Sequence, residues 1–465
     1  MPDSSAAAVI PDSRPPDRPG HPGSTGRPSS FGGTGHAPST GHPGSPGGTG
    51  HLGSMIHGRL SHPVAFAAVT AIFMLFAAAS SAPSPLYVVY QQEWGFSATT
   101  LTLVFAVYVL ALIGSLVVVG ALSDYVGRRP VLAGAIALEA VALAAFIGAG
   151  NVTVLLAARI AQGFATGAAL TTLGATLVDL NPPHAPGRAG VVNSVAPVGG
   201  LALGALGCGA LVQYAPAPTR LVFALLLLGM GLAGVVVARL PETSARRPGG
   251  LASLAPRLGV PARLRPDVYA LIPILVASWA LGGLYLSLGP SVAASLFGLA
   301  NHLVGGLVVT LLCGTGAVTA FALRSWPTGR VLRAGALLLT AGTALTLAGV
   351  EAHGMALAAA GTVIAGVGFG ASALACFGTM ARLAAPAERG ELFSVAYVIA
   401  YLAFSLPAVA AGLASTYAGL RATALVYGLA VVALGLTTLA IQRIRSARPG
   451  STSGQRGRLA RPGRG

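Results

Sequence analysis

Long apolar runs separated by short polar segments recur along the sequence from about residue 62 to about residue 442. Each run holds roughly 20 residues, enough for a tilted helix to cross about 30 Å of hydrocarbon. The runs are rich in Gly and Ala, which let membrane helices approach one another closely. The pattern predicts an all-α polytopic membrane protein with twelve spanning helices, at 64–82, 98–119, 130–149, 152–177, 189–213, 220–239, 267–288, 302–323, 333–350, 354–380, 391–414 and 421–441.

The composition supports a membrane protein and excludes a nucleic-acid partner. Hydrophobic residues make up 54% of the 465 positions and charged residues 9%, and the mean hydropathy is +0.75. The formal net charge is +16, but none of the basic residues is Lys, and the Arg residues cluster in the two tails and in alternate short loops. No folded nucleic-acid-binding motif accompanies them. The positive-inside rule accounts for this distribution.

The loop charges orient the predicted bundle in the plasma membrane. If the N-terminus lies inside, the outer loops are those after the odd-numbered spans, and they carry only Arg220 and Arg421. The inner loops then hold Arg128, Arg129, Arg188, Arg239, Arg246, Arg247, Arg257, Arg263, Arg265, Arg324, Arg330, Arg333, Arg382 and Arg389. This asymmetry predicts that both termini are cytoplasmic.

Two terminal segments and a central loop flank the predicted bundles. Residues 1–60 are rich in Gly, Pro, Ser, Thr and His, and 443–465 is a basic Gly/Arg tail; both compositions are typical of disorder. The spacing of the tail histidines defines no metal site, and the three cysteines lie in apolar runs; these residues are His21, His36, His42, His51, His57, Cys208, Cys313 and Cys376. We therefore expect no metal, disulfide or cofactor.

The loop at 241–266 divides the spans into six-helix halves, at 61–240 and 267–442. The halves echo each other at an offset near 200 residues, as in "GRRPVLAG" at 127–134 and "GRVLRAG" at 329–335. Such pseudo-symmetric halves are typical of transporters that rock between two states.

A charged turn stands between the second and third spans. The stretch "GALSDYVGRR" contains Gly120, Asp124, Gly127, Arg128 and Arg129. It resembles the motif that members of the major facilitator superfamily carry at this position, although Tyr125 replaces the usual base. Together with the twelve spans and the central loop, the resemblance covers about residues 62–442.

The resemblance implies a gate on the cytoplasmic side. In the family the acid of this motif faces the positive N-terminal end of span eleven, which here begins near Glu391. Asp124 would therefore hold the halves together, and Arg128 would bind Asp179, with Arg188 nearby. A plainer interpretation is that Arg128 and Arg129 only anchor the loop inside. Trp326 stands where the repeat would place a second acid, so the gate is one-sided.

The fourth span carries polar residues on one face. The stretch "RIAQGFATGAA" at 159–169 resembles the family's span-four motif, and Arg159, Gln162 and Thr166 share a face by helical spacing. An Arg within lipid needs a wet cavity or an acid. The resemblance assigns Arg159 to the cavity and to proton coupling; the alternative is a purely structural partner of a carbonyl or carboxylate.

Glu139 is the one carboxylate deep within a predicted span, about 13 Å from Pro130 along the third helix. Its antiparallel neighbour would carry Arg159 at a comparable depth. We expect either a Glu–Arg pair or a carboxyl that takes up and releases a proton. A protonated Glu that simply bonds to a neighbouring helix is the alternative.

Further candidates lie in the remaining spans. The stretch "SVAPVGGLALG" at 194–204 partly resembles the span-five motif of the family's exporters, so Pro197 and Gly200 are expected to kink this helix. Aromatic and polar residues suited to an amphipathic ligand, or else to helix packing, are Tyr108, Asn193, Trp279, Tyr285, Tyr397 and Tyr401, in addition to Gln162 and Thr166.

These features predict a monomeric, proton-coupled exporter of small, amphipathic, drug-like molecules. An uptake symporter of the same fold is the first alternative. A polytopic membrane enzyme is the second, but it needs paired acids or a His near the membrane face, and Asp179 with His184 is the nearest combination. The chain has no phosphate-binding loop of the ATPase type, which excludes an ATP-driven pump within it.

Overall fold

The computed structural model of the protein describes residues 60–120, 122–182, 184–185, 187–244, 248, 259–298, 301–385 and 388–447. Twelve helices in this part are long and apolar enough to cross a membrane, which confirms the predicted all-α polytopic fold. The five tail histidines and both chain ends, 1–59 and 448–465, lie outside the described residues.

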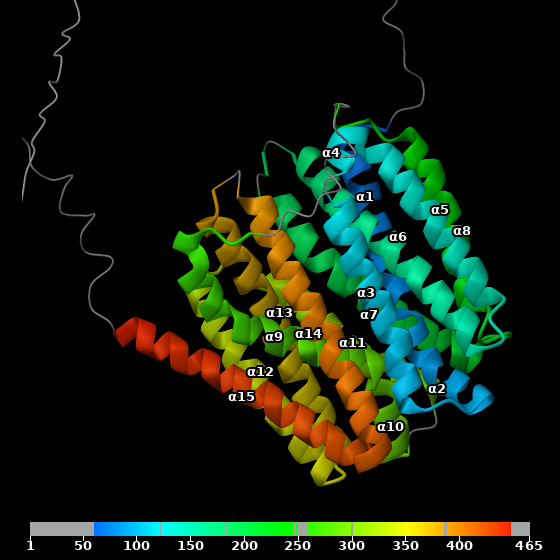
Figure 1. Cartoon of the computed structure of the whole chain (residues 1–465), viewed down its shortest axis with the longest axis vertical. Helices are drawn as coiled ribbons and strands as arrows, with labels where there is room; N and C mark the ends of the chain where they lie inside the picture. Colours follow the sequence, from blue (N-terminus) through cyan, green and yellow to red (C-terminus); the bar gives the residue numbers. More distant parts are fainter. Residues whose placement is uncertain are drawn as a thin grey trace, which may run out of the picture. The chain divides into compact units, whose positions relative to one another are not determined.

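The helices follow the order of the predicted spans (Figure 1). Their bounds are α1 His62–Ser81, α2 Pro83–Trp94, α3 Ala98–Val119, α4 Ser123–Val126, α5 Arg128–Ile147, α6 Val152–Asp179, α7 Arg188–Tyr214, α8 Leu221–Arg239, α9 Arg265–Ser287, α10 Gly289–Phe297, α11 His302–Ala322, α12 Thr328–Glu351, α13 Met355–Leu383, α14 Arg389–Ala418 and α15 Leu420–Ala447, with a short 3₁₀ turn, η2, at Ala262–Leu264 before α9.

The first span is longer than the sequence pattern predicted. It continues through α2 to Trp94, because Pro83 occupies the start of α2, where a missing backbone N–H costs nothing. Gly95, with φ of 66°, then ends the helix. The short helix α10 was not predicted either, and Pro290 and Gly298 begin and end it in the same way. At the chain's other end α15 extends to Ala447, into the predicted tail.

The helices pack as two groups. In the first group, here called the N half, α6 contacts α3 and α5, α7 contacts α1, and α8 contacts α5. In the second group, the C half, α13 contacts α11 and α12, α14 contacts α9, and α15 contacts α12. The halves meet mainly where α7 packs against α11 and where α3 packs against α14 (Figure 1).

Glycines permit the closest of these helix contacts. A Cβ on Gly163 or Gly167 of α6 would collide with the backbone of α3. Gly200 and Gly204 of α7 abut α1 in the same way, and Gly306 of α11 abuts Ala205 of α7 across the junction of the halves. Small residues are the usual means by which membrane helices pack closely.

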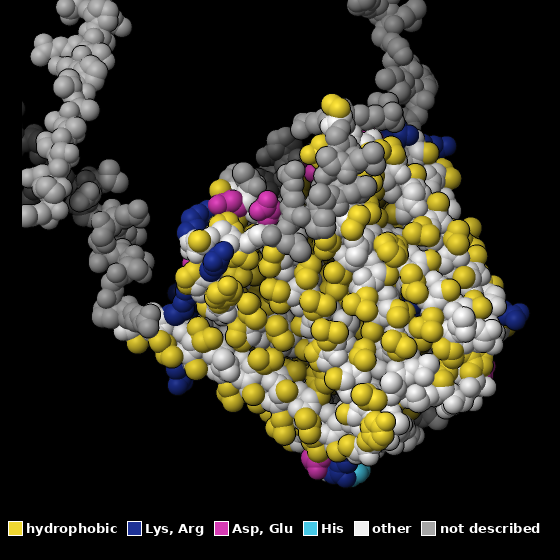
Figure 2. All heavy atoms as spheres, in the orientation of Figure 1, with side chains coloured by type: hydrophobic (Ala, Val, Ile, Leu, Met, Phe, Trp, Pro, Cys, Tyr) yellow, Lys and Arg dark blue, Asp and Glu magenta, His cyan; other side chains and the backbone are white. Residues whose placement is uncertain are grey.

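The outer surface of the bundle suits an apolar solvent. Figure 2 shows hydrophobic side chains over most of the face in view, with the charged side chains toward its edges. Large apolar residues such as Leu228 (72% exposed) and Val426 (69% exposed) point outward. This distribution is expected for helices that contact lipid.

We predict opposite effects of adding one methyl group at two glycines. Gly163→Ala should lower the stability by about 1–3 kcal/mol, because the added Cβ meets the α3 backbone. Gly134→Ala in α5, where no atom lies within 4 Å of the added Cβ, should raise it by about 0.5–1 kcal/mol. Thermal unfolding of the purified variants measures both changes, and an equal response of the two would contradict the packing described here.

Candidate functional site

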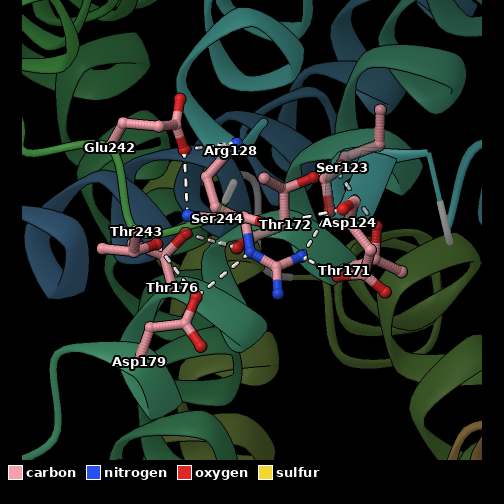
Figure 3. A network of polar contacts seen from close by, with 11 residues as sticks. Ser123, Asp124, Arg128, Thr171, Thr172, Thr176, Asp179, Glu242, Thr243 and Ser244 are labelled. Carbon is pink, nitrogen blue, oxygen red and sulfur yellow. Dashed lines mark hydrogen bonds and ion pairs between the residues drawn. The ribbon is translucent and has the colours of Figure 1, made fainter. Parts of the chain in front are cut away.

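The charged turn between α3 and α5 forms a compact polar network (Figure 3). We call the end of the bundle that carries α4 the arginine-rich side, and the other end the opposite side. Arg128, only 9% exposed, bonds through Nη1 to Asp124 Oδ1 at 2.6 Å and through Nε to Asp179 Oδ2 at 3.2 Å. Its Nη1 also donates to Ser123 Oγ at 2.6 Å. One guanidinium therefore joins α4, α5 and the end of α6.

The backbone of Gly127 makes this geometry possible. Its φ of 107° and ψ of 154° lie where residues with a Cβ are strained, and α5 begins directly after it. A Cβ there would also lie 2.9 Å from Glu242 Oε2. At Gly120, directly after α3, a Cβ would lie 2.3 Å from the Leu116 carbonyl oxygen and in ordinary contact, 3.6 Å, with Thr171 of α6. Gly127 therefore stands where the chain passes close to a neighbouring element, and Gly120 where the preceding turn of α3 leaves no room for a Cβ.

Glu242 is part of this network and was missed by the sequence analysis. Its two carboxylate oxygens accept hydrogen bonds from the backbone N–H groups of Arg128 (2.8 Å) and Arg129 (3.2 Å), which are the free donors at the N-terminus of α5. The signal was an acid in the segment "PETS", directly after the sixth span. A carboxylate at this end also complements the helix dipole.

The residues beside Glu242 attach the same segment to the motif. Thr243 Oγ1 donates to Asp179 Oδ2 (2.9 Å), and Ser244 Oγ donates to the carbonyl of Asp124 (3.3 Å). The Arg129 guanidinium binds the helix that precedes this segment, because it donates to the carbonyls of Val237 and Ala238 at the end of α8. The start of the central loop is thereby bound to three helix termini.

Two of the candidate gating residues, Asp124 and Arg188, have partners within the N half. The side chain of Asp124 is 56% exposed, and the ion pair described for it is with Arg128 of its own half rather than with the start of α14. The Arg188 guanidinium lies 5.0 Å from the centre of the Phe66 ring on α1, not on Asp179. Trp326 of the C half is 56% exposed.

We predict that Glu242→Gln destabilises the protein by about 1 kcal/mol. The carboxylate oxygens accept hydrogen bonds from the backbone N–H groups of Arg128 and Arg129, and in Gln an NH₂ group, which cannot accept, replaces one of these oxygens. Proteolysis within the Pro241–Ser244 segment should also become faster. Glu93→Gln is the matched control, since Glu93 is exposed on the opposite side. Equal melting temperatures and equal cleavage rates for both variants would show that Glu242 does not hold this segment.

A second polar cluster lies inside the N half. Glu139 of α5 and Gln162 of α6 are fully buried, and Arg159 of α6 is 1% exposed. Gln162 Nε2 donates to Glu139 Oε1 at 3.0 Å, and Gln162 Oε1 accepts from Arg159 Nη1 at 2.6 Å. The expected Glu–Arg proximity therefore takes the form of a glutamine bridge between the two charged groups.

Backbone carbonyls of α1 complete the cluster. Gln162 Nε2 also donates to Ala79 O (3.1 Å), and Arg159 Nη1 donates to Ser80 O (3.2 Å). Glu139 Oε2 and Arg159 Nε are buried without a hydrogen-bond partner among the described residues. Each charged group thus keeps one polar atom free for a further contact.

Aromatic rings and a hydroxyl pair border the cluster. The Arg159 guanidinium carbon lies 4.4 Å from the centre of the Tyr108 ring on α3 and 5.8 Å from that of Tyr87 on α2. Thr166 is 1% exposed, and its hydroxyl lies 3.5 Å from that of Ser80. The predicted face of Arg159, Gln162 and Thr166 is therefore turned toward α1, α2 and α3.

The C half presents a cluster of aromatic side chains near the junction of the halves. Its members come from α9, α13 and α14 and are Trp279, Phe377, Phe393, Tyr397, Tyr401 and Phe404. The ring centres of Trp279 and Tyr401 are 4.9 Å apart, and those of Phe377 and Tyr397 are 5.0 Å apart. Trp279 Nε1 has no hydrogen-bond partner among the described residues. The three phenylalanines were missed because their apolar rings resemble ordinary core residues in the sequence.

Other candidates lie within one half. The hydroxyl of Tyr285 lies 2.8 Å from that of Thr362, so this side chain bridges α9 and α13. Asn193 of α7 donates to Gly174 O of α6 at 3.2 Å. Pro197 stands inside α7, one turn before Gly200 and its close contact with α1. In the described part of the chain no group of three His, Cys, Asp or Glu residues could hold a metal ion.

The halves are joined by hydrogen bonds from the middle of the bundle to the opposite side. Those that link α2 or α3 to the C half run from Ser84 Oγ to Leu286 O (2.5 Å), from Thr99 Oγ1 to Gly412 O (3.4 Å) and between the hydroxyls of Thr99 and Thr416 (3.0 Å). Those that link α7 and α11 run from His302 N to Gln213 Oε1 (3.0 Å) and from Thr310 Oγ1 to Ala202 O (3.0 Å).

On the arginine-rich side every ion pair among the described residues stays within one half. The pairs of the C half are Arg263 with Glu388 and Arg445 with Asp267. Tyr397 and Phe377 near the junction are half-buried, whereas Thr102 and Ala408, toward the opposite side, are fully buried. The junction is therefore tight on the opposite side and looser on the arginine-rich side.

Solved structures of three transporters are similar to this chain in fold. A bacterial homologue of the human lysosomal transporter Spinster, solved in an inward-facing and unoccupied conformation, is 13% identical, with a TM-score of 0.64 over 82% of this chain and 97% of that one. The human organic anion transporter MFSD10 (TETRAN) is 18% identical, with a TM-score of 0.60 over 82% of this chain and 100% of that one. A D-xylose–proton symporter is 17% identical, with a TM-score of 0.62 over 81% and 97%.

No curated protein matches the sequence. The likeness to the solved structures, at these identities, concerns the fold alone. The sequence profile of the Major Facilitator Superfamily, however, matches residues 69–327, which is more than half of the chain. Together with the twelve spans, this match establishes that the chain belongs to the major facilitator superfamily of membrane transporters.

Proposed function

We propose that the protein exports small amphipathic, drug-like molecules in exchange for protons, by alternating access. The observation that carries the proposal is the buried Glu139, which has one oxygen bonded to Gln162 and the other without a described partner. A carboxyl group in the interior of a membrane transporter is a typical carrier of protons.

The cluster can link a proton to a movement of the helices. An ionised carboxylate taken out of water needs partners, and Oε2 of Glu139 has room for a proton instead. Gln162 contacts both Glu139 and Arg159, so a change of charge on the acid alters the bonds of the guanidinium. Arg159 in turn donates to α1, which lies beside α7 at the junction of the halves.

The aromatic cluster supports the class of substrate. Flat rings with polar tips, such as those of Trp279, Tyr397 and Tyr401, suit a ligand with an apolar ring and few charges. The free Trp279 Nε1 would donate to an acceptor on that ligand. The fold neighbours are named for small organic cargo, an organic anion in one case and a sugar in another, which supports the coarser substrate class.

In a protein of the plasma membrane the arginine-rich side would lie at the cytoplasmic face, with both termini in the cytoplasm. The tight opposite side then corresponds to a closed outer gate and the present structure to an inward-facing state. In the alternate state the motif network would approach α14, and Asp124 would meet its N-terminal end. A single chain contains both halves, so a monomer suffices for this cycle.

The test is a proton-flux assay in inverted membrane vesicles that hold an acidic interior. Cationic, neutral and anionic amphipaths are added in turn to wild type and to Glu139→Gln. The expected result is substrate-evoked release of protons in wild type that is lost in Glu139→Gln, because the amide cannot be protonated in this range.

The matched control is Glu351→Gln, since Glu351 is a surface acid of the opposite side, 46% exposed and paired with Arg421. It should behave as wild type. Release that persists in Glu139→Gln would remove this residue from proton coupling. Proton uptake with the substrate would contradict export and favour the uptake symporter. Silence across the whole panel would contradict export of drug-like molecules and point to import or to a substrate outside that class.

A further inference from the structure

Tyr108 of α3 lies between the polar cluster around Arg159 and the aromatic cluster of the C half. Its ring faces the Arg159 guanidinium at 4.4 Å, and the side chain is only 6% exposed. Its phenol group lies beside Ser80 and Thr166. A Cβ on Gly163 would collide with the Tyr108 carbonyl, so the backbones of α3 and α6 touch at this level. Tyr108 is therefore held firmly against the polar cluster of the N half.

The same side chain also belongs to the junction of the halves. Tyr108 shares a buried apolar cluster with Phe404 of α14, and Trp279 and Tyr401 pack against that cluster. One turn earlier on α3, the Phe105 ring lies 5.1 Å from that of Phe404. When α14 parts from α3, Tyr108 loses these contacts while Arg159 stays with the N half.

We propose that Tyr108 positions Arg159 and separates Glu139 from the substrate path, so that protons reach Glu139 only when the C half moves away from α3. This inference rests on the proposed proton coupling. The attraction between a guanidinium and an aromatic face holds the ring in place, and it is strongest where water is excluded.

The surroundings of Glu139 leave few other groups to control its charge. Arg159 reaches it through Gln162, and Tyr87 on α2 lies near Arg159, with its ring centre 5.8 Å from the guanidinium carbon. The helix α8, which also packs against α5, carries its one charged residue, Arg239, at its end. The helix α1 offers carbonyls and hydroxyls at this level and has His62 only at its start.

The experiment measures proton leak without substrate. Wild type and variants are reconstituted into liposomes with a pH-sensitive dye inside, a pH gradient is imposed, and its decay is followed. Tyr108→Ala should dissipate the gradient about tenfold faster than wild type, since loss of a desolvated cation–π contact changes an opening equilibrium by about this factor. Tyr108→Phe keeps the ring face and should stay as tight as wild type.

Three further variants make the result specific. Tyr108→Leu fills space without an aromatic face and should also leak, which covers the case in which Tyr108→Ala does not fold. Adding Glu139→Gln to Tyr108→Ala should restore tightness, because the leak runs through this carboxyl. The matched control Tyr427→Ala removes another buried tyrosine, whose hydroxyl binds Ala280 O at 2.7 Å in the C half, and should not leak.

A Tyr108→Ala or Tyr108→Leu protein as tight as wild type would overturn the inference. So would a leak that Glu139→Gln leaves unchanged, since this indicates a general packing defect. If substrate-evoked flux depends on Glu139 while both Tyr108 variants stay tight, the proposed function stands and this inference fails. If wild-type flux does not depend on Glu139, the proton-coupling role fails and this inference fails with it.

Discussion

The arrangement of the N half depends on the cost of placing charged side chains in the apolar interior of a membrane. Glu139 and Arg159 lie at such a depth with almost no exposed surface. They do not form a direct ion pair; Gln162 bonds to both, and carbonyls of α1 accept further hydrogen bonds from Arg159 and Gln162. This shared set of bonds fixes α1, α5 and α6 relative to one another, and among the described residues one polar atom of each charged group has no partner.

On the arginine-rich side, charged side chains bind the free backbone groups at the ends of helices. Glu242 binds the free N–H groups that begin α5, and Arg129 binds the carbonyls that end α8, so each charge complements the dipole of the helix it contacts. These bonds hold the N half together as one body. The halves themselves are joined by hydroxyls, carbonyls and close glycine contacts, which can separate without exposing a buried ion pair.

Much of the fold could be predicted from the sequence, because lipid imposes a length on every apolar run. The bounds of α3 match the predicted span, and the family follows from the motif and the number of spans. The end of the first span could not be predicted in this way, since Pro83 and Pro85 look like a helix break but stand at the start of α2.

The candidate site was only partly accessible to sequence reasoning. Helical spacing placed Arg159, Gln162 and Thr166 on one face, and the structure shows that face turned toward α1 to α3. The bridging role of Gln162 depends on how α5 and α6 are placed side by side, which spacing along one helix does not give. Glu242 lies more than a hundred residues from the α5 terminus that it caps, and Phe404 meets Phe105 from the other half of the chain. Both contacts come from tertiary structure.

The central claim is that protonation of Glu139 shifts the equilibrium between two states. In one state the arginine-rich end of the α3–α14 junction is closed, and in the other the opposite end is closed. Pairs of spin labels at Val126 with Glu391, and at Ser97 with Tyr417, report the two ends in lipid nanodiscs; Val126, Glu391, Ser97 and Tyr417 are all exposed. We expect the two distances to change in opposite directions as the pH is lowered in wild type, and to stop responding to pH in Glu139→Gln. Distances that ignore pH in wild type, that change in the same direction, or that still respond in Glu139→Gln would contradict the account.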